Sequence, residues 1–175
     1  MHLTDAVGLI QGAAIGQTAP AVWADLGCGS GLFTQALAHL LPAGSTLYAV
    51  DQHPQTIASP SLVSIHFLKA NFEKDALDRL PPSLTGILMA NSLHYVADKP
   101  SLLTRWQQKL TPGAPFIIIE YDSRRSNPWV PYPLPFADLK EVFVSVGYQK
   151  IVKLGERPSR YRQGNLYAAL CTVDT

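Results

Sequence analysis

The chain has 175 residues, of which 47% are hydrophobic and only 15% are charged, and its formal net charge is +1. This length and hydrophobicity fit one globular domain and exclude a disordered chain, which needs low hydrophobicity and high net charge. The small net charge argues against a strongly basic nucleic-acid module. The two cysteines, Cys28 and Cys171, are too few for a disulfide framework or a four-ligand zinc site.

No apolar run approaches the ~18 residues of a membrane span, and the N-terminus lacks the pattern of a signal peptide, so we expect a cytoplasmic protein. The histidines show no metal-ligand spacing, so no metal site is predicted. Residues 1–123 hold six Lys or Arg against nine Asp or Glu, whereas residues 124–175 hold eight against four. The basic end either presents cations to an anionic ligand or only reflects solvated faces.

Predicted strands and helices alternate along the chain, which favours a parallel sheet covered on both faces. An N-terminal helix is expected within residues 1–18, and residues 1–175 are predicted to form one domain. The expected strands are 21–26, 46–50, 63–69, 86–90, 115–119, 148–154 and 166–173. The other expected helices begin at residue 32, run from Pro54 to Pro60, and span 101–110 and 139–146.

The most informative segment is 25–31, Asp-Leu-Gly-Cys-Gly-Ser-Gly, between a predicted strand and a predicted helix. Glycines let the backbone approach a ligand closely, and the helix N-terminus offers unpaired N–H donors. A dinucleotide site needs Gly or Ala three positions after the second glycine, but Leu32 stands there. A pyrophosphate is therefore disfavoured. The turn suits a ligand with an amino acid and a nucleoside but no phosphate.

With this segment the sequence resembles the class I S-adenosylmethionine-dependent methyltransferases, of the small single-domain bacterial type. The family's first motif, an acidic residue followed by Gly-x-Gly-x-Gly, is matched by Asp25, Gly27, Gly29 and Gly31. The resemblance implies that this turn passes under the methionine portion of the cofactor and that Asp25 helps to fix its ammonium group. Cys28 is expected to be a small filler beside the cofactor.

Further matches extend the resemblance along the chain. Asp51, with Gln52 beside it, ends the second predicted strand, where the family has a carboxylate that holds the two ribose hydroxyls. Taken alone, Asp51 would be a loop or cap residue. Asn71 replaces the usual Asp that meets the adenine amino group, and its amide oxygen can accept the same bond. Phe72 either packs on the purine or supplies a backbone N–H to it, or it is an ordinary core aromatic.

The fourth and fifth motifs match less completely. Thr85-Gly86 stands where the family often has an aromatic residue and Asp, but the following Asn91-Ser92-Leu-His-Tyr resembles the Asn-x-x-Leu-His type of small-molecule members. Residues 110–114, Leu-Thr-Pro-Gly-Ala, resemble the turn before the fifth strand. The resemblance implies a Rossmann-like, seven-stranded, mostly parallel sheet with helices on both faces and an antiparallel last strand.

Residues at the carboxyl ends of the strands are the candidates for chemistry, because ligands of open α/β sheets bind there. His94 is the predicted general base, since histidine titrates near neutrality. Alternatively, it shapes the turn or lines the cofactor pocket. Glu120 and Asp122 follow the fifth strand and are predicted to orient an acceptor amine or hydroxyl. Otherwise they are helix-cap or surface residues.

Residues 124–165 are expected to form a variable loop, helix and hairpin on the substrate side. The proline-rich loop 127–135 contains Trp129 and Tyr132, so it is either a semi-rigid lid over an aromatic or hydrophobic acceptor or a stiff connector. At most two of the nearby arginines are expected to bind a carboxylate or phosphate. These arginines are Arg124, Arg125, Arg157, Arg160 and Arg162.

The sequence therefore predicts a methyltransferase that uses S-adenosylmethionine, with S-adenosylhomocysteine as product. The predicted acceptor is a small molecule that is anionic or aromatic and is methylated at oxygen, nitrogen or carbon. Two alternatives are a non-catalytic binder of either cofactor form and an RNA methyltransferase, although nucleic acid is the less favoured partner. A third is a nicotinamide-dependent oxidoreductase. The expected assembly is a monomer or a homodimer.

Overall fold

Seven strands form one sheet in the computed structural model, which describes residues 1–13, 15, 19–59, 62–158 and 164–173. The strands are β1 (Val22–Leu26), β2 (Thr46–Asp51), β3 (Ser64–Lys69), β4 (Gly86–Ala90), β5 (Phe116–Tyr121), β6 (Lys150–Pro158) and β7 (Asn165–Thr172). Their spatial order is β3-β2-β1-β4-β5-β7-β6. The first five strands are parallel, whereas β7 runs antiparallel to both β5 and β6. The predicted sheet is confirmed.

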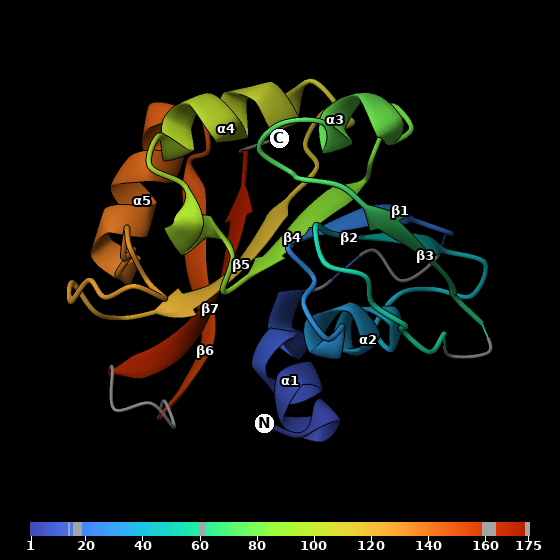
Figure 1. Ribbon diagram of the computed structural model, residues 1–175, viewed down its shortest axis with the longest axis horizontal. Coiled ribbons are helices and arrows are strands. Elements are labelled where there is room, and N and C mark those ends of the chain that lie inside the picture. Colours follow the sequence, from blue (N-terminus) through green and yellow to red (C-terminus); the bar gives the residue numbers. More distant parts are fainter. Residues whose placement is uncertain (14, 16–18, 60–61, 159–163, 174–175) are drawn as a thin grey trace.

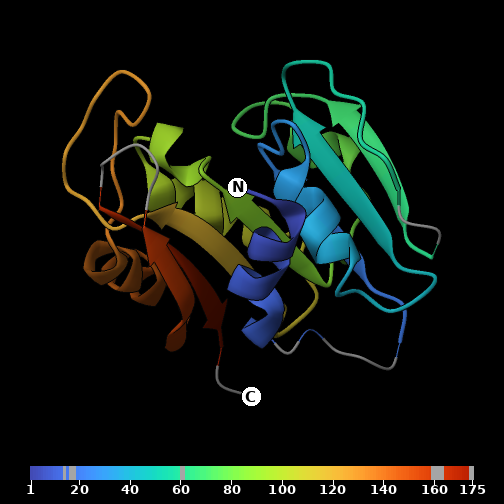
Figure 2. The ribbon, with the colours of Figure 1, turned by 90° about the horizontal axis from the view of Figure 1, so that it is seen from below.

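Helices cover both faces of the sheet (Figure 1). They are α1 (Leu3–Ile10), α2 (Leu32–Ala38), α3 (Ala76–Arg79), α4 (Lys99–Gln107) and α5 (Phe136–Ser145), with 3₁₀ turns η1 (Gln11–Ala13) and η2 (Leu93–Tyr95). Figure 2 shows α1 beside α2 on one face, and α3, α4 and α5 lie on the other. The N-terminal helix predicted within residues 1–18 ends in η1, and residues 14 and 16–18 lie outside the described part.

The helix predicted from Pro54 to Pro60 is wrong, because residues 52–59 contain no helix and residue 60 lies outside the described part. Helix formation in a segment this short depends on tertiary packing more than on local propensity. Its Ile57 packs instead against the glycine turn. A Cβ on Gly31 would lie 2.7 Å from the Ile57 Cγ1 atom.

The core lies on both sides of the sheet, and β5 contributes to both. Phe116 and Ile118 face the cluster that contains Trp106 of α4, whereas Ile117 and Ile119 face the cluster beneath α1 and α2. All four strand residues are fully buried. A strand buried on both faces reads as a continuous apolar run, so this segment is visible in the sequence.

The atypical Thr85-Gly86 at the start of β4 has a structural explanation. The Thr85 hydroxyl accepts a hydrogen bond from the Val22 N–H at 2.9 Å and donates to the Val22 carbonyl at 3.0 Å. A Cβ on Gly86 would lie 2.4 Å from the buried Trp23 ring. The glycine therefore makes room for the indole, and this departure from the family pattern concerns packing.

Candidate active site

Three glycines between β1 and α2 adopt positive φ angles, which are +81° at Gly27, +50° at Gly29 and +81° at Gly31. Residues with a side chain rarely adopt this conformation. The Gly27 N–H donates to the Val50 carbonyl at 2.8 Å and so fixes the turn to the end of β2. A Cβ on Gly27 would lie 2.5 Å from the Ser92 Cβ, whereas one on Gly29 would meet nothing within 4 Å. The turn is closed toward β4 and open at Gly29.

Asp51 ends β2 and connects two loops through its carboxylate. Its Oδ2 accepts a hydrogen bond from the Gly29 N–H at 2.9 Å, and its Oδ1 accepts from the His53 N–H at 2.8 Å. Each carboxylate oxygen can accept a second hydrogen bond. Both oxygens therefore remain able to accept a ligand hydroxyl.

The loop after β3 is held from α4. The Trp106 Nε1–H donates to the Phe72 carbonyl at 3.1 Å, and an Arg105 Nη2–H donates to the Glu73 carbonyl at 2.7 Å. The Asn71 amide oxygen, predicted to meet an adenine amino group, already accepts the Glu73 N–H at 2.8 Å. A second lone pair of that oxygen is the acceptor that remains for a ligand.

Asn91 and Ser92 follow β4 under tight constraint. Asn91 has a φ of +52°, and its N–H donates to the Ile119 carbonyl at 2.8 Å. The Asn91 Oδ1 is buried and has no hydrogen-bond partner among the described residues. The Ser92 hydroxyl donates to the Leu26 carbonyl at 2.6 Å. Strained backbone and an unpaired buried acceptor are common at ligand sites.

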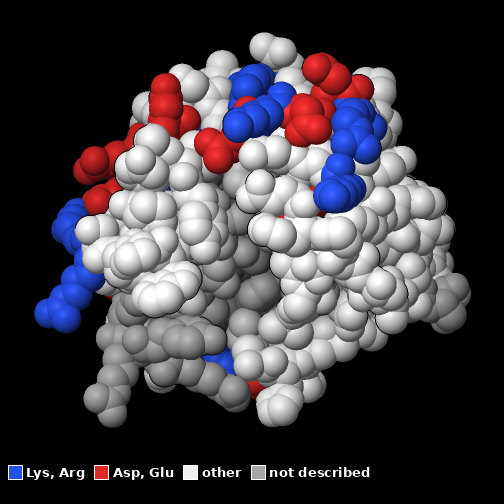
Figure 3. Space-filling model, viewed as in Figure 1, with Lys and Arg blue, Asp and Glu red and all other residues white. Residues whose placement is uncertain are grey.

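These loops surround a cavity of about 600 Å³ at the carboxyl ends of the parallel strands. Figure 3, which has the same view as Figure 1, shows a hollow in the middle of the face turned toward the viewer. Nine of the eleven predicted cofactor-binding residues line the cavity. They are Gly27, Cys28, Gly29, Asp51, Gln52, Asn71, Phe72, Asn91 and Ser92. Gly31 and Asp25 are the two that do not line it.

Several lining residues were not predicted as ligand contacts, among them Ser30, Phe33, His53, Ala70 and Glu73. Each lies one or two positions from a predicted residue, so extending each predicted loop by two residues would have included them. Cys28 lies inside the turn, and burial raises the pKa of its thiol, which therefore stays protonated. The described lining contains no Lys or Arg.

Asp25 lies beneath the glycine turn, fully buried. The Thr34 hydroxyl donates to its Oδ2 at 2.5 Å, while its Oδ1 has no partner among the described residues. Burial raises the pKa of Asp25 to about 7, the Thr34 bond opposes that change, and the Asp51 charge adds to it. A role in fixing an ammonium group stays a prediction for this residue.

Asp25→Asn is expected to stabilise the protein at pH 8 and to lose this advantage as the pH falls toward 4. An unfolded Asp releases its proton near pH 4, whereas the folded carboxyl keeps it to about pH 7. The free energy of unfolding of the unmodified protein therefore falls by ~1.4 kcal/mol per pH unit as the pH rises from about 4 to about 7, or by about 4 kcal/mol in total.

Thermal unfolding of both proteins from pH 4 to pH 8 measures this difference. Asp78→Asn, at an exposed position of α3, is the control and should show no such trend. A difference between Asp25→Asn and the unmodified protein that does not change with pH would contradict the interpretation.

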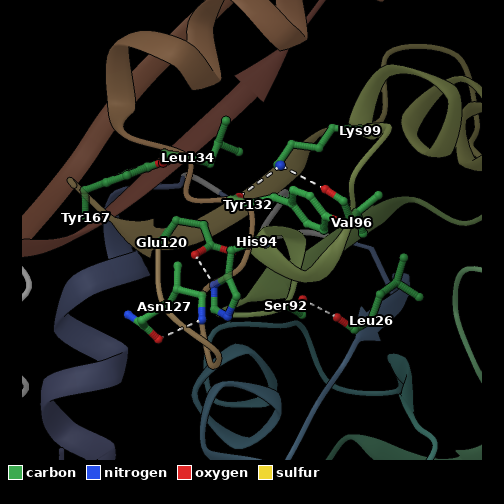
Figure 4. Close-up of polar contacts among 11 residues, drawn as sticks. Leu26, Ser92, His94, Val96, Lys99, Glu120, Asn127, Tyr132, Leu134 and Tyr167 are labelled. Carbon is green, nitrogen blue, oxygen red and sulfur yellow. Dashed lines mark hydrogen bonds and ion pairs between the residues drawn. The ribbon is translucent and has the colours of Figure 1, made fainter. Parts of the chain in front are cut away.

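His94 and Glu120 form a buried pair beside the cavity (Figure 4). The His94 Nδ1 lies 2.6 Å from the Glu120 Oε2, and the His94 backbone N–H donates to the Glu120 Oε1 at 3.0 Å. The side chains are 3% and 1% exposed. His94 is not itself in the lining, but the adjacent Tyr95 is, and their ring centroids lie 4.4 Å apart. The structure thus brings two of the three predicted catalytic residues together.

Asp122 is separate from this pair. Its Oδ1 accepts the Phe136 N–H at 3.0 Å, at the start of α5, and its Oδ2 lies 3.3 Å from the Lys153 Nζ. Asp122 does not line the cavity. These contacts favour the cap alternative, so we give Asp122 no part in the proposed mechanism.

Several cations of the basic end already have acidic partners. Arg124 pairs with Asp138, and the Arg157 Nη1 lies 3.0 Å from the Asp5 Oδ2. Arg160 and Arg162 lie outside the described residues. In the described part of the chain, no group of three or more His, Cys, Asp or Glu side chains could hold a metal ion, and none of the helices there is long and apolar enough to cross a membrane.

A sheet of this order, with a glycine turn after β1 and a cavity where the parallel strands end, defines a class I methyltransferase fold. A family model described as a methyltransferase domain matches residues 24–116, just over half of the chain. The chain therefore belongs to this family, as the sequence motifs predicted.

Curated relatives match part of the chain. A trans-aconitate 2-methyltransferase from Mycobacterium tuberculosis (strain ATCC 25177 / H37Ra) is 34% identical over 91 residues, which cover 51% of this chain and 33% of that protein. The enzyme of the same name from Mycobacterium sp. (strain KMS) is 33% identical over 103 residues, with 58% and 39% covered. The match thus covers only 33% to 39% of the length of these relatives.

Solved structures match more of the chain at lower identity. A SAM-dependent methyltransferase from Aquifex aeolicus is 15% identical with a TM-score of 0.68, covering 97% of this chain and 90% of that one. The 1,6-didemethyltoxoflavin-N1-methyltransferase of Burkholderia thailandensis, solved with 1,6-didemethyltoxoflavin and S-adenosylhomocysteine, is 19% identical with a TM-score of 0.68, covering 98% and 80%. At these identities the likeness establishes the fold.

Proposed function

We propose that the protein transfers the methyl group of S-adenosylmethionine to a small-molecule acceptor. The observation that carries this proposal is the convergence of nine predicted cofactor residues on one cavity, next to the buried His94–Glu120 pair. Family membership supports the same reaction class. The hypothesis includes the cofactor that occupies the cavity, the residues that act in catalysis and the kind of acceptor.

The donor set around the cavity fits this cofactor. Gly29 leaves open space where a Cβ would stand, and the buried Asn91 Oδ1 offers an acceptor without a partner. The Asp51 carboxylate suits ribose hydroxyls, since its oxygens can accept two donors. A lining with carboxylates and, in its described part, no Lys or Arg suits a nucleoside without phosphate better than a pyrophosphate.

The protein's own contribution is alignment and exclusion of water. When bound, the cofactor supplies a methyl group activated by a sulfonium, so positioning is the main requirement. Asp51 would hold the ribose hydroxyls, Asn91 would accept a hydrogen bond from the cofactor, and Phe72 would pack against its purine. The turn at Gly27 and Gly29 lets the backbone approach the ligand.

The His94–Glu120 pair supplies a general base where the acceptor arrives protonated. Glu120 accepts from the backbone N–H and lies against the Nδ1, so it fixes the ring orientation. With the Nδ1 proton directed at Glu120, the Nε2 is the nitrogen that can take a proton from an acceptor hydroxyl or amine. Histidine bases of this kind contribute about 10²- to 10⁴-fold in rate.

For the acceptor, we favour an aromatic compound over an anion. Tyr95 lines the cavity, and Tyr132 and Trp129 of the proline-rich loop are 46% and 74% exposed. Against an anion, the described lining lacks cations, and Arg124 and Arg157 have acidic partners. A panel of phenols, aromatic amines and carboxylates, including trans-aconitate, separates these classes.

Calorimetric titration with S-adenosylmethionine, S-adenosylhomocysteine and NAD tests the cofactor. Asp51→Asn is expected to weaken binding of S-adenosylhomocysteine by roughly 10- to 100-fold, because charge-assisted bonds contribute about 1.5–3 kcal/mol. Asp78→Asn, away from the cavity, is the control and should bind as the unmodified protein does. Binding of NAD without binding of either S-adenosyl compound would refute the proposal.

Formation of S-adenosylhomocysteine over the acceptor panel tests catalysis. His94→Gln should retain cofactor binding and lose turnover. Tight cofactor binding with no turnover on any acceptor class would contradict the enzymatic proposal and favour a non-catalytic binder. Turnover on RNA with steeply salt-dependent binding would instead support the nucleic-acid alternative.

A further inference from the structure

Lys99 is a buried cation that the proposed reaction does not use. It is 7% exposed and begins α4, where the preceding Asp98 caps the helix by accepting the Ser101 N–H at 3.1 Å. Its Nζ donates to the Val96 carbonyl at 2.9 Å and to the Tyr132 carbonyl at 3.0 Å. Lysine is rarely buried without partners, because its ammonium group loses hydration. Figure 4 shows the ammonium group directed between the chain after β4 and the proline-rich loop.

Tyr132 of the proline-rich loop is held through both its backbone N–H and its backbone carbonyl. The Tyr132 N–H donates to the carbonyl of His94 at 3.0 Å, while its carbonyl accepts from Lys99. One residue of the loop is therefore fixed between the proposed general base and a buried ammonium group.

The loop on either side of Tyr132 is also packed. Val130 and Leu134 are 4% and 3% exposed, and the Tyr167 hydroxyl donates to the Leu134 carbonyl at 2.7 Å. Trp129, which immediately precedes Val130, projects outward and is 74% exposed. The loop is thus an anchored wall beside the His94–Glu120 pair, and Lys99 is its charged anchor.

Charge also favours Lys99 at this place. Burial lowers the pKa of Lys99, and the Glu120 carboxylate offsets part of this decrease. The aromatic ring of Tyr132 lies 5.7 Å from the Nζ and adds a cation–π contact. Both Glu120 oxygens contact His94. The Lys99 ammonium group and the Glu120 carboxylate therefore attract each other through space and not through these contacts.

We propose that Lys99 is a positioning residue that clamps the proline-rich loop, residues 127–135, against His94 and thereby fixes the acceptor-side wall of the site. Without the ammonium group, the buried Val96 carbonyl and the part-buried Tyr132 carbonyl lose this donor, and an unpaired buried carbonyl is unfavourable. The loop is the element that can give way, since its outer side already faces solvent. The clamp rests on geometry alone, whereas its effect on the acceptor rests on the proposed function.

Lys99→Met tests the clamp without any substrate. We expect amide hydrogen exchange at Tyr132 to accelerate at least about tenfold, because its bond to the His94 carbonyl opens more often. Tryptophan fluorescence anisotropy should fall, and the change is assigned to Trp129 because Trp23 and Trp106 are fixed in the core, at 1% and 0% exposed. Unchanged exchange and anisotropy would overturn the clamp.

Lys109→Met is the matched control, because the Lys109 Nζ also donates to a backbone carbonyl, that of Leu80 at 3.2 Å, but away from the loop. It should leave Tyr132 exchange unchanged. If Lys99→Met does not fold, Lys99→Gln, which keeps one amide donor but no charge, gives the same comparison. Equal acceleration in the Lys99 and Lys109 variants would mean general loosening and would overturn the clamp.

The effect of Lys99→Met on acceptor binding is measured separately, by steady-state kinetics. Lys99→Met should bind S-adenosylhomocysteine within about twofold of the unmodified protein, while the acceptor KM rises at least about tenfold and kcat changes less. A loosened loop with an unchanged acceptor KM would overturn the positioning role. If neither the unmodified protein nor the variants bind S-adenosylhomocysteine, the proposed function fails, and the exchange data still decide whether Lys99 clamps the loop.

Discussion

Gly27→Ala is expected to lower the affinity for S-adenosylhomocysteine at least about 100-fold and to destabilise the protein by roughly 2–5 kcal/mol. The residue has a φ of +81°, and a Cβ there would lie 2.5 Å from the Ser92 Cβ and 3.3 Å from the Phe72 Cε1. Ser92 is buried and bonded to the Leu26 carbonyl, so it cannot move aside. The turn itself must shift, and the cofactor loses its cradle. Calorimetric titration and thermal unfolding measure the two effects.

Alanine substitutions at two other glycines with positive φ separate the cost of backbone strain from the cost of a steric clash. Gly147→Ala, after α5, has a φ of +95° and nothing within 4 Å of the added Cβ, so it should cost only ~1 kcal/mol and leave binding unchanged. Gly29→Ala also meets no protein atom but projects where the cofactor is proposed to lie, so it should reduce binding more than stability. If Gly27→Ala binds as well as Gly147→Ala, the proposed cradle is wrong.

Glu120→Ala is expected to lower the free energy of unfolding by about 3–5 kcal/mol and the Tm by roughly 10 °C. The substitution leaves the buried His94 without its acceptor and the buried Lys99 without its nearby countercharge. Removing one member of a buried pair is far more costly than replacing the whole pair. Denaturant unfolding monitored by circular dichroism checks the value.

Arg124→Ala is the contrasting case, because it breaks the exposed ion pair with Asp138. Its Tm should stay close to that of the unmodified protein, since exposed pairs contribute little. A Glu120→Ala Tm that falls no further than that of Arg124→Ala would contradict the importance of the buried pair. Glu120→Gln keeps the side-chain shape and shows how much of the loss is due to charge.

The sheet and much of the proposed cofactor site follow from local patterns. Positive φ angles at Gly27 and Gly29 favour glycine strongly, so the glycines in the sequence predict the turn. The continuous apolar run at β5 is visible because both faces are covered. Parallel strands end at one edge, so Asp51 and Asn91 could be placed together from their positions alone.

Other features depended on partners distant in the sequence. His94 and Glu120 are 26 residues apart, and only the pairing of β4 with β5 brings them within 2.6 Å. Asp122, which looked equivalent to Glu120, contacts α5 and Lys153. The anchoring of Tyr132 by Lys99 left no local pattern, because the lysine binds backbone carbonyls, which every residue carries.

For this protein, the sequence determined which backbone positions can turn sharply and which segments are buried, because those requirements restrict residue type locally. The tertiary structure decided which side chains meet. Asp25 became a buried carboxyl beneath the turn, Pro54–Pro60 became a packed connection without a helix in its described part, and Lys99 became the partner of a distant loop. Hydrogen bonds and buried charges are satisfied by whatever the fold brings near, and that is fixed only when the sheet is assembled.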